Sequence, residues 1–176
     1  HKHKIIKMIK NNYLTKSLLT LFTVAIFGSA NAQYCSSGAG STADTKCDRV
    51  VLVGSSATID NNTSSSGCVT YSDFSSSVAP ADLSPGAVYT IDITTGTCGG
   101  TYSKTANGWI DFNGDGDWTD AGEMLGTGTS YVSTTGTVVS YNFTVPCNAK
   151  SGNTKMRVIV VEGGQATNPC LAYTWG

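Results

Sequence analysis

The sequence predicts an all-β protein, a β-sandwich or jelly-roll-like arrangement of mainly antiparallel strands that carries one acidic loop of the calcium-binding type. Three observations predict this fold class. Short runs of β-branched and aromatic residues recur along the chain, clusters of Gly, Ser, Thr and Asn separate them, and helix signals are nearly absent after residue 32. Such residues favour turns and strands over helix interiors.

Five segments have the composition of strands, and each is bordered by turn residues. They are 49–53, 87–93, 109–112, 138–145 and 156–161. Alternation of apolar and polar residues in the second and fourth segments places one face toward the core and the other toward water. The Ser-, Thr- and Asn-rich stretch 55–66 is interpreted as a long surface loop, and a further β-type run begins at Leu171.

The N-terminal segment has the three parts of a secretory signal peptide. Basic residues precede an apolar run at 18–27, and small residues lead to Ala30-Asn31-Ala32, so cleavage is expected before Gln33. A transmembrane anchor is the alternative, but ten helical residues span only about 15 Å, half of a hydrocarbon core. We therefore predict a signal peptide at 1–32, with 1–7 as an upstream extension before Met8, and a secreted or cell-surface domain at 33–176.

Removal of residues 1–32 makes the domain acidic. That segment holds five of the 11 Lys and Arg and none of the 12 Asp and Glu, which leaves six basic against 12 acidic groups. An acidic domain is a poor partner for nucleic acid or an anionic membrane surface. The partners expected instead are an extracellular protein or glycan and downstream domains of the same polypeptide, with no membrane span.

All six cysteines lie in the predicted exported domain. An even number in an exported chain predicts up to three disulfides, with 15 possible pairings. Thiolate metal ligands are the alternative, but they favour C-x-x-C pairs and the chain has none. The cysteines are Cys35, Cys47, Cys68, Cys98, Cys147 and Cys170.

Five of the twelve acidic residues fall within the thirteen positions of segment 111–123. The segment opens with the pattern D-x-N-x-D-G, which is the first half of a helix-loop-helix calcium loop. Ca²⁺ prefers hard oxygens, and glycine at the sixth position permits the turn that lets side chains at the first, third and fifth positions converge. The predicted ligands are Asp111, Asn113, Asp115, Asp117 through its backbone carbonyl, and Glu123, with Asp120 acting through water.

A solvated acidic turn is the alternative to a bound cation. It would crowd several carboxylates together without a counter-ion, with Lys104 and Lys150 as the nearest basic residues in sequence. The segment also departs from the full helix-loop-helix pattern, because Gly122 stands at the twelfth position and no helix signal flanks it. We therefore expect a calcium loop between strands rather than a helical switch.

The residues also bear on catalysis and on sugar binding. Both histidines lie in residues 1–32, so the exported domain lacks the usual general base and a His ligand for zinc. We predict no enzyme; a glycosidase that uses Asp73 or Asp82 remains the enzymatic alternative. Trp109 and Trp118 are expected to pack the acidic loop onto the sheets, and an exposed Trp118 beside the calcium would instead indicate a carbohydrate-binding module.

The order of the motifs resembles the GEVED domain, a module of secreted proteins in Bacteroidetes-type bacteria named for a terminal Gly-Glu-Val-Glu-Asp. The motifs lie within Tyr34 to Gly176 and comprise Tyr71-Ser72-Asp73-Phe74, Trp109 to Asp117 with Gly122-Glu123, Phe143 to Pro146, Ala149, Gly152, Met156-Arg157-Val158 and Pro169-Cys170. The terminal signature would begin at Gly176, so we expect a C-terminally incomplete domain. The resemblance implies a non-catalytic β-sandwich accessory module that accompanies secreted proteases, adhesins or cell-surface proteins.

Overall fold

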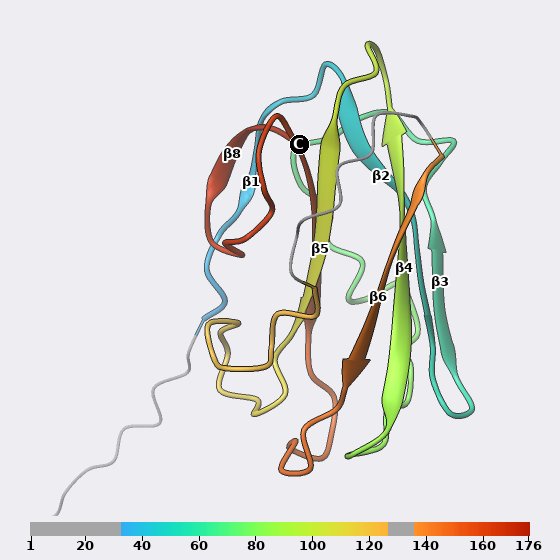
Figure 1. The fold of residues 1–176 in the computed structure, drawn as a ribbon, viewed down its shortest axis with the longest axis vertical. Helices are drawn as coiled ribbons and strands as arrows, with labels where there is room; N and C mark the ends of the chain where they lie inside the picture. The colour runs from blue at the N-terminus through green and yellow to red at the C-terminus, as the bar shows by residue number, and fades with distance from the viewer. Residues whose placement is uncertain (1–32, 127–135) are drawn as a thin grey trace, which may run out of the picture. The chain divides into compact units, whose positions relative to one another are not determined.

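The computed structural model describes residues 33–126 and 136–176, and the predicted signal peptide lies outside them. The described residues form eight strands and no helix, so the prediction of an all-β, mainly antiparallel fold is confirmed (Figure 1). The strands are β1 (Gly38–Ser41), β2 (Thr45–Val53), β3 (Thr58–Asn62), β4 (Val88–Thr97), β5 (Lys104–Ile110), β6 (Val138–Thr144), β7 (Met156–Glu162) and β8 (Ala172–Trp175). Within these residues no helix is long and apolar enough to cross a membrane.

The largest sheet has four antiparallel strands in the order β3-β2-β4-β6. Its central strands alternate as expected: Ile91 and Ile93 of β4 are fully buried, whereas Val88 and Thr90 face solvent. The pairing of β2 with β4 shifts by one residue between Cys47 and Arg49, which is a local bulge in β2.

Strand β3 corrects the interpretation of residues 55–66 as a loop. It pairs with β2 over five positions, from Arg49↔Asn62 to Val53↔Thr58. The sequence concealed this strand because it lies at the edge of the sheet, where only Ile59 packs against the core and its neighbours are polar and exposed. The composition of residues 58–62 is therefore typical of a loop, although their backbone pairs with β2 as a strand.

Strands β5 and β7 form a separate antiparallel pair that is covered on both faces. One face, which includes Ala106, Ile110 and Val160, shares a hydrophobic cluster with Ile91 of the four-stranded sheet and its neighbours. A Cβ on Gly108 would lie 3.4 Å from Cδ1 of Ile91, so β4 and β5 pack closely across the cluster. Double coverage explains why every residue of β5 is buried.

The second face of the β5–β7 pair contributes Trp109 and Val161 to a smaller hydrophobic cluster, which Trp118 and Ala166 complete. Figure 1 shows the parallel pair β1–β8 on this side of β5, opposite the four-stranded sheet. Both tryptophans are nearly inaccessible, at 1% and 3% exposure. The expectation that they pack the acidic loop onto the sheets is confirmed, and the alternative of an exposed Trp118 is wrong.

Two disulfides link the described residues, Cys35–Cys170 and Cys68–Cys98, so the upper limit of three is not reached. Cys47 and Cys147 lie at opposite ends of the four-stranded sheet. Cys47 pairs with Thr95 of β4, whereas Cys147 follows β6 beyond its pairing with Val88. Seven residues of strand separate these levels by about 23 Å, far beyond the reach of a disulfide.

Candidate functional site

The acidic loop, defined as residues 111–123, leaves the end of β5 and returns to the same strand. On its return, the amide of Ile110 donates to the Glu123 carbonyl oxygen at 3.0 Å, and the Leu125 amide donates to the Gly108 carbonyl oxygen at 2.8 Å. Met124 adds an antiparallel bridge to Trp109. Both ends of the loop are thereby attached to a fully buried strand, which is the rigid support that a binding loop requires.

Asp111 is buried on the inner side of the acidic loop and binds the loop's backbone amides. Its side chain is 1% exposed, and Oδ1 accepts the amide of Gly114 at 2.6 Å while Oδ2 accepts the amide of Gly116 at 3.0 Å. Such bonds satisfy a buried carboxylate and fold the chain tightly around it. Gly114 and Gly116 have φ of 68° and 95°, so the turn needs the left-handed backbone that glycine adopts without strain.

The next three polar residues each hold the backbone two positions ahead. Asn113 Oδ1 accepts the amide of Asp115 at 2.9 Å, Asp115 Oδ1 accepts the amide of Asp117 at 3.1 Å, and Asp117 Oδ1 accepts the amide of Thr119 at 2.7 Å. The last contact lowers the pKa of Asp117 because the amide and hydroxyl of Thr119 stabilise the charged form. The successive side-chain bonds therefore hold these three side chains in a defined order along the loop.

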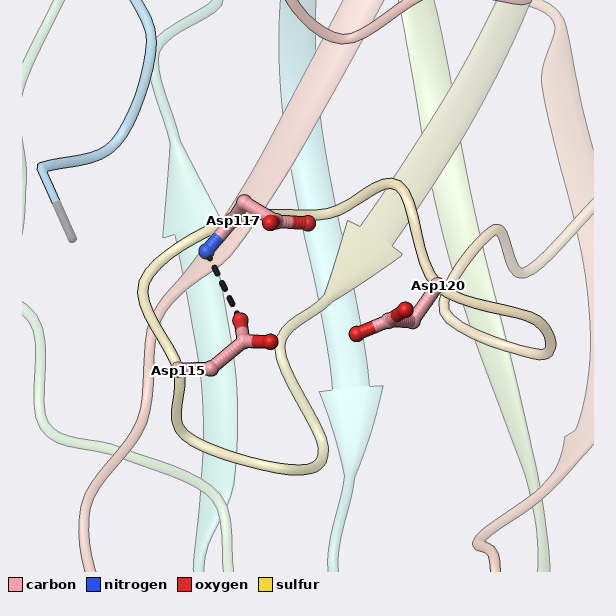
Figure 2. A group of neighbouring side chains, drawn as sticks. All are labelled: Asp115, Asp117 and Asp120. Atoms are coloured by element: carbon pink, nitrogen blue, oxygen red, sulfur yellow. Dashed lines mark hydrogen bonds between the residues drawn. The ribbon is translucent and has the colours of Figure 1, made fainter.

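Three carboxylates converge at the mouth of the loop. Oxygens of Asp115, Asp117 and Asp120 all lie within 4.8 Å of one another. Figure 2 shows the Asp115 and Asp120 carboxylates pointing toward each other across the loop, with the Asp117 amide bonded to Asp115. The Asn113 amide nitrogen bridges two of them, at 2.9 Å from Asp115 Oδ2 and 2.6 Å from Asp120 Oδ2. We call Asp115, Asp117 and Asp120 the carboxylate triad.

Glu123 lies under the loop, 2% exposed, and is only partly satisfied. Its Oε1 accepts the Phe112 amide at 3.0 Å, while the buried Oε2 has no hydrogen-bond partner among the described residues. Burial raises the pKa of Glu123, and the charge of Asp111 raises it further. An unpartnered buried carboxylate oxygen is costly and fits either a proton or a cation.

The structure therefore divides the predicted ligands into two groups. Asp115 and Asp117 join Asp120 at the mouth, and Asn113 bridges them through its amide. Asp111 and Glu123 are not part of the triad; both are buried on the inner side of the loop. Asp120, considered as a ligand through water, places its own carboxylate in the triad. Asp117, predicted to bind through its backbone carbonyl, places its carboxylate there as well.

Three residues distant in sequence, Tyr34, Lys150 and Arg157, also contact the acidic loop. Tyr34 donates from its hydroxyl to Asp111 Oδ2 at 2.6 Å and stacks on Trp118 with ring centroids 4.3 Å apart. The Arg157 guanidinium lies 4.0 Å from the Trp118 ring centroid on the same cluster. Lys150 reaches the loop as well, its Nζ 3.3 Å from the Gly114 carbonyl oxygen. These residues lie 36 to 84 positions from their partners, so the pattern of the loop itself does not predict the contacts.

Glu123 predicts a pH dependence of the metal-free protein. A raised folded-state pKa means that its stabilising contribution is present below the ordinary value of 4.5 and is lost as pH rises through the raised pKa. Glu123→Gln mimics the protonated form, so at pH 7 in chelator this variant should be more stable than the wild type, and the gap should close toward pH 4. Urea unfolding across this range measures it.

The control for this prediction is Glu162→Gln, because Glu162 is half-buried on β7 and bonded to the Thr45 hydroxyl at 2.8 Å. That variant should keep the wild-type rise in stability toward low pH. A wild-type protein and a Glu123→Gln variant with the same pH profile would contradict the assignment of the raised pKa to Glu123.

Fold and site define an all-β, disulfide-linked module whose acidic loop projects from a doubly covered strand. The family model of the GEVED domain matches residues 105–176, so the predicted relationship to that family is confirmed. The match begins in β5 and includes the whole acidic loop and strands β6 to β8. No curated protein matches the chain, and no solved structure matches it either.

Proposed function

We propose that the protein is a non-catalytic, calcium-stabilised β-sandwich that serves as a binding or adhesion module of a larger exported or cell-surface protein. The carboxylate triad is the observation that carries this proposal: three carboxylates within 4.8 Å of one another repel unless a cation or protons neutralise them. The unpartnered Oε2 of Glu123 is a further buried oxygen that either a proton or a cation would satisfy.

Calcium fits the donor set better than zinc or copper. Each member of the carboxylate triad offers oxygen, and neither imidazole nor thiolate is part of it. Calcium takes roughly 6–8 oxygens in flexible geometry, which three carboxylates and solvent water can supply. The ligands we propose are Asp115, Asp117 and Asp120. Asn113 holds two of them in place through its amide nitrogen, and the buried Asp111 and Glu123 support the loop from its inner side.

The disulfide chemistry and the predicted signal peptide both support an extracellular role. The two disulfides are consistent with an oxidising location. Millimolar calcium outside cells suits an exposed site of modest affinity. In this setting the cation would keep the acidic loop ordered on the sheets, and the surrounding surface would meet an extracellular protein or glycan.

The absence of catalysis is part of the proposal and rests on residue chemistry. Residues 33–176 contain no histidine. Burial raises the pKa of the Cys47 thiol to about 12, so this cysteine is protonated and poorly nucleophilic at neutral pH. Asp82, one of the two acids considered for a glycosidase, accepts bonds from the amides of Ser56 and Ala57, which lower its pKa to about 2. A carboxylate so stabilised is a poor general acid.

Calorimetric titration of the metal-free protein with Ca²⁺ tests the proposal. We expect heat from a saturable site and a rise in melting temperature, because a ligand that binds only the folded state stabilises it by about 2.7 kcal/mol at a concentration 100 times its dissociation constant. Absence of heat and an unchanged melting temperature in millimolar Ca²⁺ would refute a calcium-stabilised module.

Asp→Asn variants, which remove charge and keep side-chain shape, locate the site. Asp115→Asn combined with Asp120→Asn removes two triad carboxylates and keeps their shape, and it should abolish the calcium-dependent rise in melting temperature. Asp92→Asn is the control, since Asp92 bonds to Ser140 on the outer face of the four-stranded sheet and should leave the calcium response intact. An equal loss in both proteins would indicate non-specific screening of an acidic domain rather than a site.

A further inference from the structure

Tyr34 joins the start of the described chain to the base of the acidic loop. Its hydroxyl donates to Asp111 Oδ2 at 2.6 Å, and its ring stacks on Trp118 at a centroid distance of 4.3 Å. Burial, followed by the bond to Asp111, raises the pKa of Tyr34 to about 12, so the hydroxyl stays a donor at neutral pH. Tyr34 thus contacts both Asp111, which binds the loop backbone, and the buried Trp118.

A covalent link holds Tyr34 in this position. The next residue, Cys35, is bonded to Cys170, which lies 135 positions further along the chain. Arg157 strengthens the junction because its two terminal nitrogens donate to the carbonyl oxygens of Pro169 and, at 2.8 Å, of Cys35, and its guanidinium lies over Trp118. Without the disulfide, the segment that carries Tyr34 would lose its covalent link to Cys170, and ordering it against the loop would cost more conformational entropy.

Asp111 connects Tyr34 to the carboxylate triad through its hydrogen bonds. Oδ2, which accepts the Tyr34 hydroxyl, also accepts the Gly116 amide, and Gly116 lies between Asp115 and Asp117 of the carboxylate triad. Loss of the tyrosine contact would leave Asp111 less fixed and the turn that spaces the two carboxylates less well held. The disulfide, Tyr34, Asp111 and Gly116 form one continuous set of contacts.

We propose that Tyr34 is a positioning residue for the cation site and that the Cys35–Cys170 disulfide holds it there, so that disulfide formation and calcium binding are thermodynamically coupled. The coupling rests on the proposed calcium site. By linkage it is reciprocal: the disulfide strengthens calcium binding by the same factor by which calcium protects the disulfide from reduction. A domain that binds calcium fully only after oxidation would reach its ordered state after export, not before.

Calcium affinity of disulfide variants tests one direction of the coupling. Cys35→Ser with Cys170→Ser should weaken Ca²⁺ binding by a factor in the range of about 5 to 150, as measured by calorimetry. The matched control is Cys68→Ser with Cys98→Ser, which removes the other disulfide, one of shorter sequence separation, and should leave affinity within about twofold. Tyr34→Phe keeps both disulfides and the stacked ring, and it should weaken binding in the same direction by losing only the hydroxyl.

The reverse direction has an internal control in the wild-type protein. A small dithiol attacks each disulfide by exchange, gives two electrons and two protons to the cysteine sulfurs, and itself becomes a cyclic disulfide. At saturating Ca²⁺, equilibrium reduction of Cys35–Cys170 should fall by the same factor as the affinity difference, while reduction of Cys68–Cys98 should not change. Alkylation of the released thiols followed by peptide mass spectrometry quantifies both bonds in one sample.

A metal-free readout separates this inference from the proposed function. Hydrogen exchange of the Gly114 and Gly116 amides, measured in chelator, should accelerate in Tyr34→Phe and in the Cys35→Ser, Cys170→Ser variant, but not in the control. If the wild type binds calcium and these variants bind it equally well, the coupling is overturned and the proposed function stands. If the wild type binds no calcium, the proposed function and the coupling both fall, and amide exchange alone decides whether Tyr34 positions the loop.

Discussion

Replacement of Trp118 with alanine is expected to destabilise the domain by about 3–5 kcal/mol, the usual cost of removing a large buried aromatic side chain. Trp118 is 3% exposed and lies between the Tyr34 ring, at 4.3 Å, and the Arg157 guanidinium, at 4.0 Å. The variant therefore leaves a cavity and removes the stacking and cation–π contacts of both neighbours. Urea unfolding in chelator measures the loss without a contribution from calcium.

Trp175→Ala is the matched control, because Trp175 is 50% exposed at the end of β8. It should cost far less than Trp118→Ala. Trp118→Phe is informative as an intermediate: it keeps a ring against Tyr34 and removes an indole nitrogen that has no hydrogen-bond partner among the described residues. Equal effects of the two alanine variants would contradict the assignment of Trp118 to the buried cluster.

Ile91→Ala should have the second largest effect, a loss of about 2–5 kcal/mol. Ile91 is fully buried at the centre of the cluster between the four-stranded sheet and the β5–β7 pair. Opposite its Cδ1 lies Gly108, which has no side chain that could move into the cavity. The cost should therefore approach the upper end of the range, as measured by the shift of the urea midpoint at constant slope.

Val88→Ala is the control on the same strand, because Val88 is 66% exposed on the outer face of the sheet. Its substitution should change stability by no more than about 0.5 kcal/mol, as is usual for surface positions. A small loss from Ile91→Ala, comparable to that of Val88→Ala, would mean that the two sheets do not share one core.

The acidic loop illustrates how far local sequence predicts a site. Its five acids, its glycines and the D-x-N-x-D-G spacing predicted a tight oxygen-rich turn, since these are properties of consecutive residues. The convergence of Asp115, Asp117 and Asp120 depends on the path of the backbone between them, which the bonds to Asp111 set. For that reason the grouping of Asp120 with Asp115 and Asp117, and the burial of Glu123 away from them, could not be read from the spacing alone.

The amino-acid sequence by itself determined the all-β class, the positions of the strands with apolar alternation and the acidic character of the loop, because each follows from interactions between near neighbours. Only the tertiary structure decided that β3 is an edge strand, which pairing the cysteines adopt and that Trp118 is buried. It also brought Tyr34 to Asp111 across 77 positions. Such contacts form between segments distant along the chain, where packing and burial, rather than local propensity, determine the lowest free energy.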